Sequence, residues 1–476
     1  MTSRFLLLLL IACRTWAVKP GVKMRLTQSG INYANGVARL AVLDLIQNMK
    51  IENYEGKSGK TTYWLSNIHS ESVTPPNSEM TLSPGLNGLT WTVTNFGIKL
   101  YTDWRVKHKV WFVPISASGG LSADFSGVRL SLTIGVDLDG GSRPVLRSRG
   151  CSADIGGLNL RFRGGLVSWI LNLFKGLFEN KVKNMIRDRI CSLVDKSING
   201  VVADKVKQMR VSVDIAERFV LDYGFIAPVI ITSGYLETQH SGEVYWKNDR
   251  RPTPYTPADI PAQGDASKML YIWLTDFTAL TFGYAAHTHG YLQYTLSPDK
   301  LKGNNSNYLD TSCPTSICAG SIIPEIAERY PNSKVTIKIA SAAPPEIKFT
   351  SNGIDLVLLA SVIFSAGSSN AFLDGTVSFT LSGSASVRNE LIFGSISHSS
   401  IQISNVNSTI GTVDQTQINR ILALGIQSVI LPQINSFAQG GIPLPTFDDI
   451  KLPDSQITFQ DGYLVISSNV QYKGVQ

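Results

Sequence analysis

Helical and strand periodicities of hydrophobic residues follow the same order on both sides of a proline-rich segment. This repeat constrains the fold of the chain more than any other feature. Residues 247–263 contain four prolines, which fix φ and remove backbone donors, so we expect an extended linker there. In each half an amphipathic helix comes first, alternating strands follow, a second helix comes late, and strands close the half. A length of 476 residues allows two such domains. The sequence therefore predicts a pseudo-duplicated α+β chain.

The predicted elements occupy matching places in the two halves. In the first half, apolar spacing predicts helices over residues 31–49 and 166–206, with a break near Asn199-Gly200, and strands over residues 60–160. In the second half it predicts a short helix over 322–330, strands over 334–403, and a helix over 413–439 that Pro432 should kink. Similar closing strands begin at Tyr235 and Tyr463.

The amino terminus has the pattern of a secretory signal peptide. Arg4 precedes an apolar run that is too short to span a membrane, and small residues precede a cut after Ala17. We therefore expect residues 1–17 to be removed, leaving domains at 18–246 and 264–476 with the linker at 247–263. Removal takes Cys13 with it and leaves an even number of cysteines for an oxidising compartment.

Four cysteines allow three disulfide pairings. Pairing Cys151 with Cys191 and Cys313 with Cys318 is favoured, because each pair lies within one half of the chain. Sequons at Asn304 and Asn407 also fit a secreted glycoprotein.

The charge is distributed unevenly. Residues 18–247 carry 28 basic and 19 acidic side chains, a net charge of +9, whereas residues 248–476 carry a net charge of −4. A basic first half predicts an anionic partner, and secretion without a nucleic-acid-binding motif favours anionic lipid, lipopolysaccharide or sulfated glycan over nucleic acid. A solvated basic surface is the alternative.

A bulky apolar stripe on the long helix of the first half has three interpretations. It could be ordinary core, the wall of a cavity for acyl chains, or a helix lying on a membrane surface. The second helix of the other half carries a similar face. The pocket-lining candidates are Leu166, Trp169, Ile170, Leu173, Phe174, Leu177, Phe178, Ile418, Leu422 and Ile430.

Catalytic motifs are missing from the sequence. It contains no hydrolase nucleophile elbow, no HExxH and no phosphate-binding glycine loop. His287 and His289 would share one face of a strand, but no further metal ligand is apparent, so we expect no metal site. A binding or transfer protein is favoured over an enzyme.

Several motifs, in order along the mature chain, resemble one family. They are Val18-Lys19-Pro20-Gly21-Val22, Ser29-Gly30-Ile31-Asn32-Tyr33-Ala34, Cys151 and Cys191 around the Trp169 helix, Asp222-Tyr223-Gly224-Phe225-Ile226-Ala227-Pro228, Gly242-Glu243-Val244-Tyr245 and Ile442-Pro443-Leu444-Pro445. The chain resembles the bactericidal/permeability-increasing and lipopolysaccharide-binding protein family over nearly its whole mature length.

The resemblance implies a boomerang of two barrel-like domains, each a twisted antiparallel sheet around long helices, joined by a central sheet. It also implies an apolar pocket for phospholipid in each domain and supports the bridge between Cys151 and Cys191. Cys313 and Cys318 lie outside the family's common pattern, so their pairing rests on the counting argument alone.

In endotoxin-binding members of the family, cations at the tip of the N-terminal domain contact the ligand. The corresponding hairpin here spans residues 97–111, in which Asp103 is an acidic departure from the basic pattern. The implied lipopolysaccharide contacts are Lys50, Lys57, Lys60, Lys99, Arg105, Lys107, His108 and Lys109. Alternation of Arg105, Lys107 and Lys109 equally fits the exposed face of a strand.

These observations lead to a functional expectation. We expect a secreted, extracellular innate-immune protein with antibacterial activity that binds lipopolysaccharide at the bacterial outer membrane surface. It should hold phospholipid in its pockets, require no other cofactor and bind no nucleic acid. The alternative is an extracellular phospholipid transfer or carrier protein. The missing terminal amphipathic helix disfavours neutral-lipid transfer of the kind performed by the plasma cholesteryl ester carrier.

Overall fold

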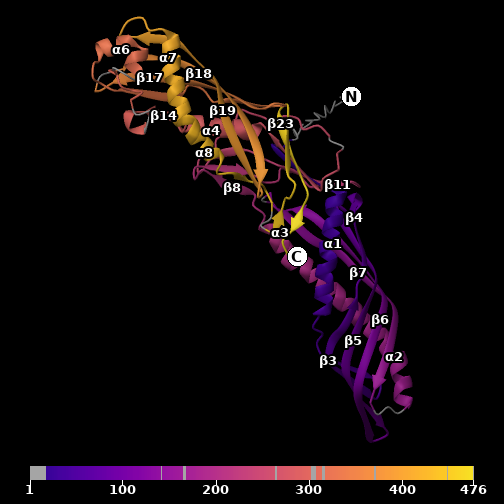
Figure 1. Cartoon of the computed structure of the whole chain (residues 1–476). Coiled ribbons are helices and arrows are strands. Elements are labelled where there is room, and N and C mark those ends of the chain that lie inside the picture. Colours follow the sequence, from indigo (N-terminus) through magenta and orange to yellow (C-terminus); the bar gives the residue numbers. More distant parts are fainter. Residues whose placement is uncertain are drawn as a thin grey trace, which may run out of the picture.

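The molecule is elongated and bent, with a sheet-and-helix unit at each end and a further sheet between them (Figure 1). The computed structural model describes residues 18–140, 142–164, 168–262, 265–301, 307–313, 317–368, 371–446 and 449–474. Figure 1 shows the N-terminal and C-terminal halves placed end to end rather than side by side. The chain is therefore a mixed α+β protein with two curled sheets, as predicted.

The N-terminal half is built on a six-stranded antiparallel sheet. Its order is β2 (Tyr54–Ser58), β3 (Thr61–Thr74), β5 (Gly88–Val110), β6 (Val113–Leu138) and β7 (Pro144–Arg163), and β4 (Asn77–Ser83) also pairs with β5. Buried and exposed residues alternate along β5, so one face of the sheet packs on the core and the other faces solvent.

The C-terminal half repeats this arrangement with seven strands. Its order is β14 (Gln293–Leu296), β15 (Val335–Ser341), β17 (Gly353–Ala366), β18 (Ala371–Arg388), β19 (Leu391–Ser408) and β20 (Ile442–Pro443), and β16 (Glu346–Thr350) pairs with β17. Each half encloses its own hydrophobic core, built around residues such as Phe96 and Phe125 in the first half and Phe364 and Phe372 in the second.

A central sheet joins the halves. Its order is β10 (Ile230–Ile231), β11 (Tyr235–His240), β1 (Val22–Thr27), β13 (Leu270–Thr275), β23 (Tyr463–Ser468) and β22 (Gln456–Gln460). The strands predicted to close each half are β11 and β23, and both lie here. Two small sheets, β12 (Val244–Trp246), β9 (Phe219–Asp222) and β8 (Ser212–Ile215), and β21 (Ile450–Lys451) with β24 (Gln471–Tyr472), flank this region.

The predicted helices of the first half are present. The first is α1 (Gln28–Gln47), and the long one is α2 (Ser168–Ser197), followed by a π-helical turn at Ile198–Val202 and α3 (Ala203–Lys207). The expected break near Asn199 is therefore a π turn, which adds a residue to the turn without ending the helix.

The second half holds one helix that the sequence did not predict. We expected His287 and His289 on a strand, but His287 lies in α4 (Phe277–Thr288) and His289 caps its end. This helix is apolar or small on nearly all sides, so it lacks the stripe that reveals an amphipathic helix. It follows β13 as α1 follows β1, and it is therefore the true counterpart of the first helix.

The other helices of this half agree with prediction more closely. The short helix is α6 (Pro324–Arg329), preceded by α5 (Ala319–Ile322), and Pro324 occupies its first turn. The late helix is α7 (Gln415–Gly425), a π-helical turn at Ile426–Ile430 and α8 (Leu431–Ala438). Pro432 lies just after the interruption.

A buried ion pair lies in the central sheet. Arg25 on β1 donates from Nε and Nη2 to Glu237 Oε2 on β11, at 3.0 and 2.6 Å, and both side chains are less than 10% exposed. Lys23 Nζ lies 3.8 Å from the same carboxylate, and burial lowers the pKa of Lys23. Ile260 of the linker packs against a cluster of Tyr271, Trp273, Tyr463 and Val465 in this sheet, so the linker helps to cover it. Residues 250–262 form no helix or strand.

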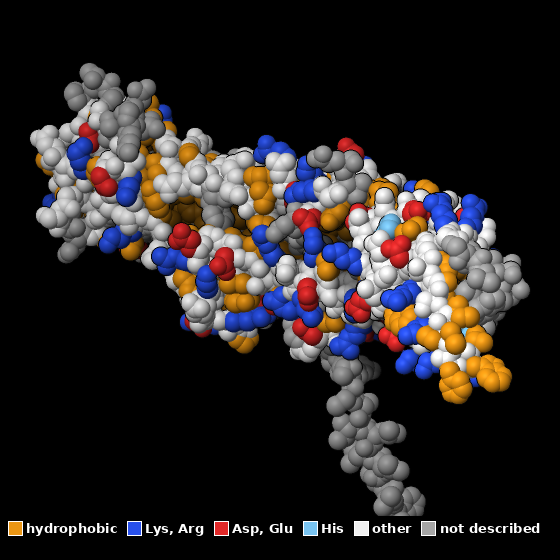
Figure 2. Space-filling view, turned by 90° about the horizontal axis from the view of Figure 1, so that it is seen from below, with side chains coloured by type: hydrophobic (Ala, Val, Ile, Leu, Met, Phe, Trp, Pro, Cys, Tyr) orange, Lys and Arg blue, Asp and Glu red, His pale blue; other side chains and the backbone are white. Residues whose placement is uncertain are grey.

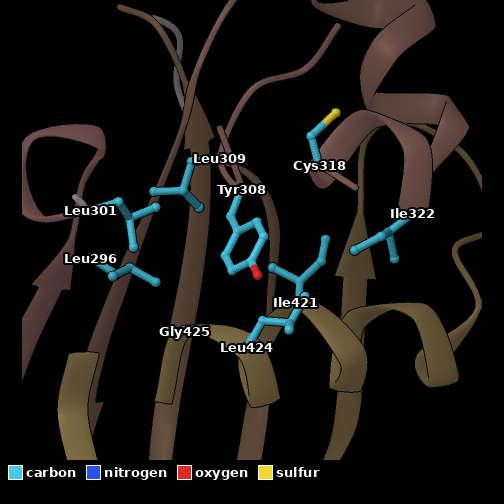
Figure 3. Close-up of a pocket in the computed structure, with 9 residues that line it drawn as sticks. All are labelled: Leu296, Leu301, Tyr308, Leu309, Cys318, Ile322, Ile421, Leu424 and Gly425. Atoms are coloured by element: carbon cyan, nitrogen blue, oxygen red, sulfur yellow. The ribbon is translucent and has the colours of Figure 1, made fainter. Parts of the chain in front are cut away.

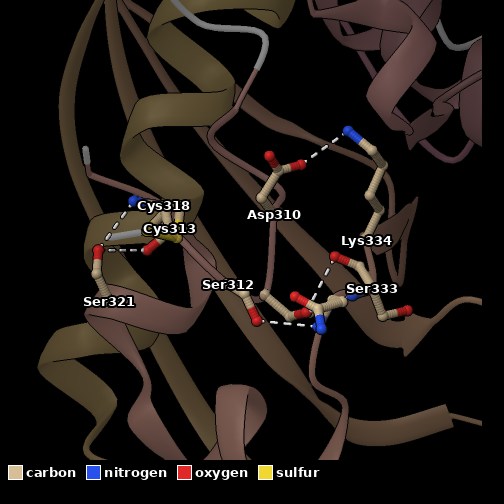
Figure 4. Close-up of a disulfide and its surroundings, with 9 residues drawn as sticks. Asp310, Ser312, Cys313, Cys318, Ser321, Ser333 and Lys334 are labelled. Atoms are coloured by element: carbon tan, nitrogen blue, oxygen red, sulfur yellow. Dashed lines mark hydrogen bonds and ion pairs between the residues drawn. A yellow bond between two sulfur atoms is a disulfide. The ribbon is translucent and has the colours of Figure 1, made fainter. Parts of the chain in front are cut away.

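Both favoured disulfides are present. Cys151 on β7 is bonded to Cys191 on α2, which fixes the long helix to its own sheet. Cys313 is bonded to Cys318, next to α5 (Figure 4). Cys318 begins that helix, where its backbone N–H donates to Ser321 Oγ at 2.9 Å. Nearby, Lys334 Nζ and Asp310 Oδ1 form an ion pair at 2.8 Å.

Removal of the disulfide that closes the longer loop should lower the stability more than removal of the disulfide that closes the shorter loop. The cysteines of the first disulfide are 40 residues apart and those of the second only 5. Loop-closure entropy then predicts a loss of about 4 kcal/mol for the double variant C151A/C191A and about 2 kcal/mol for C313A/C318A. Denaturant unfolding followed by circular dichroism would measure both. Equal losses would contradict the entropic explanation.

His240 provides a pH-sensitive contribution in the central sheet. The side chain is fully buried, its Nδ1 donates to the Tyr223 carbonyl at 2.7 Å, and its Nε2 lies 2.8 Å from Thr238 Oγ1. Burial lowers its pKa from 6.5 to about 4. The folded protein therefore keeps this imidazole neutral at pH values at which the unfolded chain binds a proton.

Stability should consequently fall as the pH is lowered from 6.5 to 4. In this window the unfolded state binds more protons at this position than the folded state, which amounts to about 3 kcal/mol in total. Unfolding free energies of the wild type and His240→Gln, measured between pH 7.5 and 4, should show a shallower dependence in the variant. Parallel curves would show that His240 does not contribute.

Candidate functional site

The hairpin of β5 and β6 ends in a two-residue turn at the far end of the N-terminal half (Figure 1). Val110 pairs with Val113, which leaves Trp111 and Phe112 as the turn. Trp111 has φ of 54°, in the left-handed region that bulky residues rarely adopt. The side chains of Trp111 and Phe112 are 85% and 94% exposed. With the exposed Val110 and Val113 on either side, these two aromatic side chains form a contiguous exposed apolar patch, a feature typical of interaction sites.

Three of the predicted cations lie together beside this turn. Arg105, Lys107 and Lys109 are exposed on one face of β5, while the intervening Trp104 and Val106 are buried in the core. Lys57 on β2 joins them, since it is opposite Thr62, which is itself opposite Lys107. Figure 2 shows hydrophobic side chains projecting at this end of the molecule, with Lys and Arg side chains around them.

Two predicted contacts do not belong to this group. His108 alternates with its neighbours and faces the other side of the strand, where its Nδ1 lies 2.7 Å from Thr61 Oγ1. Lys99 is farther along β5, and its Nζ forms an ion pair of 2.8 Å with Glu71, which lowers the pKa of that carboxyl. His108 is separated from the cations by strand alternation. Lys99 is separated from them by its position on the strand, and its charge is paired with that of Glu71, a cross-strand partner that the sequence does not reveal.

Lys60 and Lys50 take different positions. Lys60 is exposed in the turn between β2 and β3, and its carbonyl accepts from the Lys109 N–H at 3.1 Å, so it belongs to the hairpin end. Lys50 follows α1, and its carbonyl accepts from Arg189 Nη2 of α2 at 2.7 Å. Lys50 is therefore placed by contacts with the helices and not by the hairpin.

The acidic departure in the hairpin is held by hydrogen bonds. Asp103 accepts from Tyr101 Oη at 3.1 Å and from Asn67 Nδ2 at 3.3 Å, and the first of these raises the pKa of Tyr101. These hydrogen bonds hold the Asp103 carboxylate in place but leave its charge unchanged, so Asp103 remains an acidic group on the strand that carries Arg105.

The aromatic pair of the turn was missing from the predicted site. Cation counting selects lysines and arginines and ignores apolar residues, which are usually buried. A usable signal exists, however. Trp111-Phe112 follows an alternating strand at a point where the pairing register requires a turn, and turns are exposed.

The C-terminal half contains a small apolar space (Figure 3). Its volume is about 10 Å³, and Figure 3 shows Ile421 and Leu424 of α7 beside Tyr308, with Cys318 above them. A space of this size holds about one water molecule, so it is much smaller than an acyl chain requires. The remaining lining residues are Leu296, Leu301, Leu309, Ile322 and Gly425.

The predicted pocket residues of this half lie next to that space. Ile418 and Leu422 are buried in the core, and Ile430 packs against the same core from a half-buried position. Residues three or four apart share a helix face, so Ile418, Ile421 and Leu422 form the buried face of α7, and Ile421 also lines the space together with Leu424. The stripe of α7 therefore serves mainly as core.

Other predicted residues fall outside the described part of the structure. These are the signal peptide at residues 1–17, Asn304, Leu166, and the side chains of Trp169, Ile170, Leu173, Phe174, Leu177 and Phe178. Asn407 is exposed on β19, where its Nδ2 donates to Asp374 Oδ1 at 3.0 Å.

A larger space of about 500 Å³ lies near the junction of the halves. Its walls are mixed, with apolar side chains such as Phe225 and Phe277 beside the charged Arg250. Arg250 forms ion pairs with Asp222 and Glu243.

Neither a metal site nor a membrane span is found in the described residues. No group of three or more His, Cys, Asp or Glu side chains there has the arrangement of a metal site. Among the helices of the same residues, none combines the length and apolar character needed to cross a bilayer.

Comparison with known proteins places the chain in a family. Two sequence models of the LBP / BPI / CETP family match it, the N-terminal domain over residues 30–202 and the C-terminal domain over residues 213–472. The chain belongs to this family.

Individual relatives match over nearly full length. The bactericidal permeability-increasing protein of Sebastes schlegelii is 24% identical, with 97% of each chain covered. The lipopolysaccharide-binding protein of Homo sapiens is 22% identical, with 96% of this chain and 94% of that protein covered. A crystal structure of lipopolysaccharide binding protein superposes with a TM-score of 0.62 at 22% identity, covering 96% of this chain and all of the other, which shows the shared fold.

The aromatic side chains of the turn should not stabilise the fold. Because Trp111 occupies the left-handed region, Trp111→Asn should raise the unfolding free energy by up to about 1 kcal/mol, and Phe112→Ser should leave it nearly unchanged. Trp104→Ala, in the buried layer of the same strand, should lose about 3 to 5 kcal/mol. Denaturant titration of the three variants tests this, and a large loss at Trp111 would mean that the aromatic pair is structural.

Proposed function

We propose that this chain is a secreted innate-immune protein that captures lipopolysaccharide of Gram-negative bacteria through the end of its N-terminal hairpin. The observation that carries the proposal is that two exposed aromatic side chains and three exposed cations lie together at the hairpin end. These are Trp111 and Phe112, and Arg105, Lys107 and Lys109. The printed names of its relatives, bactericidal permeability-increasing protein and lipopolysaccharide-binding protein, support the same ligand. The proposal includes antibacterial activity, phospholipid as a second ligand, and glycosylation at Asn407.

The two kinds of side chain would make different contributions to binding. Each lysine or arginine near an anionic lipid surface contributes about 1 kcal/mol, and this part weakens as salt is added. Burial of Trp111 and Phe112 among acyl chains would contribute about 1.5 to 3 kcal/mol each, largely independent of salt. Arg105 can also bind a phosphate through two parallel N–H donors, whereas the lysines act as point charges.

Binding across a salt series tests the proposal. Purified protein is titrated with lipopolysaccharide and with phosphatidylcholine vesicles between low and high salt. The wild type should prefer lipopolysaccharide, with an affinity that falls as salt rises. Salt-insensitive uptake of phospholipid with no such preference would contradict the proposal and favour an extracellular phospholipid carrier.

Variants separate the two contributions. The charge reversal R105E/K107E/K109E should weaken lipopolysaccharide binding at least about a hundredfold at low salt and much less at high salt. W111N/F112S should weaken it at all salt concentrations. The matched control R129E/R147E/K196E changes three exposed cations of the same half away from the hairpin end. Unchanged binding in the first variant, or equal loss in the control, would rule out the hairpin end as the binding surface.

A further inference from the structure

One face of the central sheet carries hydrogen-bond donors from three adjacent strands. Pairing of β1 with β11 and β13 places Lys23 opposite Gln239 on one side and opposite Trp273 on the other. Adjacent strands are about 4.8 Å apart, so these three side chains, here called the Lys23 row, lie next to one another. The neighbours of Lys23 along β1, Val22 and Met24, alternate with it and pack into the hydrophobic core behind the sheet.

The linker covers the face that carries the Lys23 row. Ile260 packs against the cluster that contains Trp273, and Asp259 Oδ1 forms an ion pair of 2.8 Å with Lys19 Nζ. Lys23 is 6% exposed and Trp273 is 1% exposed. The row is therefore shielded from bulk water, in which its donors would otherwise find acceptors.

In the described part of the chain, two groups of this row lack an acceptor within hydrogen-bond distance. Lys23 Nζ is 3.8 Å from Glu237 Oε2, and that oxygen already accepts two hydrogen bonds from Arg25. The ammonium also lies 4.7 Å from the centre of the Trp273 ring. The Nε1 atom of Trp273 is buried and has no hydrogen-bond partner among the described residues. Burial lowers the pKa of Lys23, as expected for a poorly solvated ammonium.

We propose that a chloride ion binds at the Lys23 row, between the central sheet and the linker, and accepts hydrogen bonds from Lys23 Nζ, Trp273 Nε1 and the Gln239 amide. Glu237 belongs to the next row, about 7 Å along the strand, where Arg25 holds its carboxylate. The site is separate from the hairpin end and does not depend on the proposed function.

The charge and the burial of the row favour a small anion. A buried ammonium needs negative charge as well as an acceptor, and a chloride ion supplies both, whereas a water molecule supplies only the acceptor. A phosphate group or a lipid headgroup is larger and would have to displace Ile260 from the sheet. A chloride ion bound here would also connect β11, β1 and β13, so it would stabilise the sheet that joins the two halves.

Thermal unfolding in two sodium salts tests the site. Sodium chloride replaces sodium methanesulfonate stepwise at constant ionic strength. The unfolding temperature of the wild type should rise by about 2 °C once chloride is at about ten times its dissociation constant. Lys23→Met should abolish this response, and the control Lys338→Met, which changes an exposed lysine on β15, should keep it. Equal unfolding temperatures of the wild type in the two salts would overturn the proposal.

A second variant tests the indole donor without changing any charge. Trp273→Phe keeps an aromatic ring and removes the N–H group. Its chloride titration should need about tenfold more chloride than that of the wild type, the usual effect of losing a hydrogen bond to a charged group. An unchanged titration would contradict the assignment of the ion to this row. Circular dichroism shows whether each variant is folded, and this variant remains decisive if Lys23→Met does not fold.

Diffraction with bromide locates the ion directly. Crystals of the wild type grown in sodium bromide should give an anomalous peak within hydrogen-bond distance of Lys23 Nζ and Trp273 Nε1. Peaks on the molecular surface alone would indicate an adventitious ion only and would rule out the site.

Discussion

The antiparallel pairing of β1 with β13 is the contact on which the two-part architecture depends. It joins the first strand of one half to the first strand of the other through Val22–Leu274 to Leu26–Leu270. Gly21 allows the adjoining backbones to meet, because a Cβ there would lie 2.3 Å from the Ser241 carbonyl oxygen. Each strand is followed by a helix of its own half, α1 or α4, so the pairing sets the position of both halves. The buried Arg25–Glu237 pair lies on the same sheet, and loss of either partner would leave a charge without compensation.

The sequence was most informative where periodicity and burial coincide. The long strands, α1, α2 and the late helix of the second half have one apolar face, and all were predicted close to their observed positions. The α4 helix was missed because burial on most sides removes its polar face. The π turns in both long helices were also beyond prediction, since an extra residue in one turn depends on packing from neighbouring elements.

The candidate site shows the same limits. Alternation alone was sufficient to place Arg105, Lys107 and Lys109 on one exposed face. It could also have excluded His108, which falls on the opposite face, but the prediction gave charge more weight than register. The ion pair between Lys99 and Glu71 depends on strand pairing that a single sequence does not specify.

The length of the hairpin also determines how the molecule can stand on a surface. β5 and β6 contain 23 and 26 residues and run without an intervening loop to the turn at Trp111. At about 3.3 Å per residue, such a strand spans about 75 Å, several times the thickness of a sheet-and-helix layer. A protein bound to a surface by the end of this hairpin could hold its long axis away from that surface. Its C-terminal half would then be raised far above the surface, free to meet other molecules in the surrounding fluid.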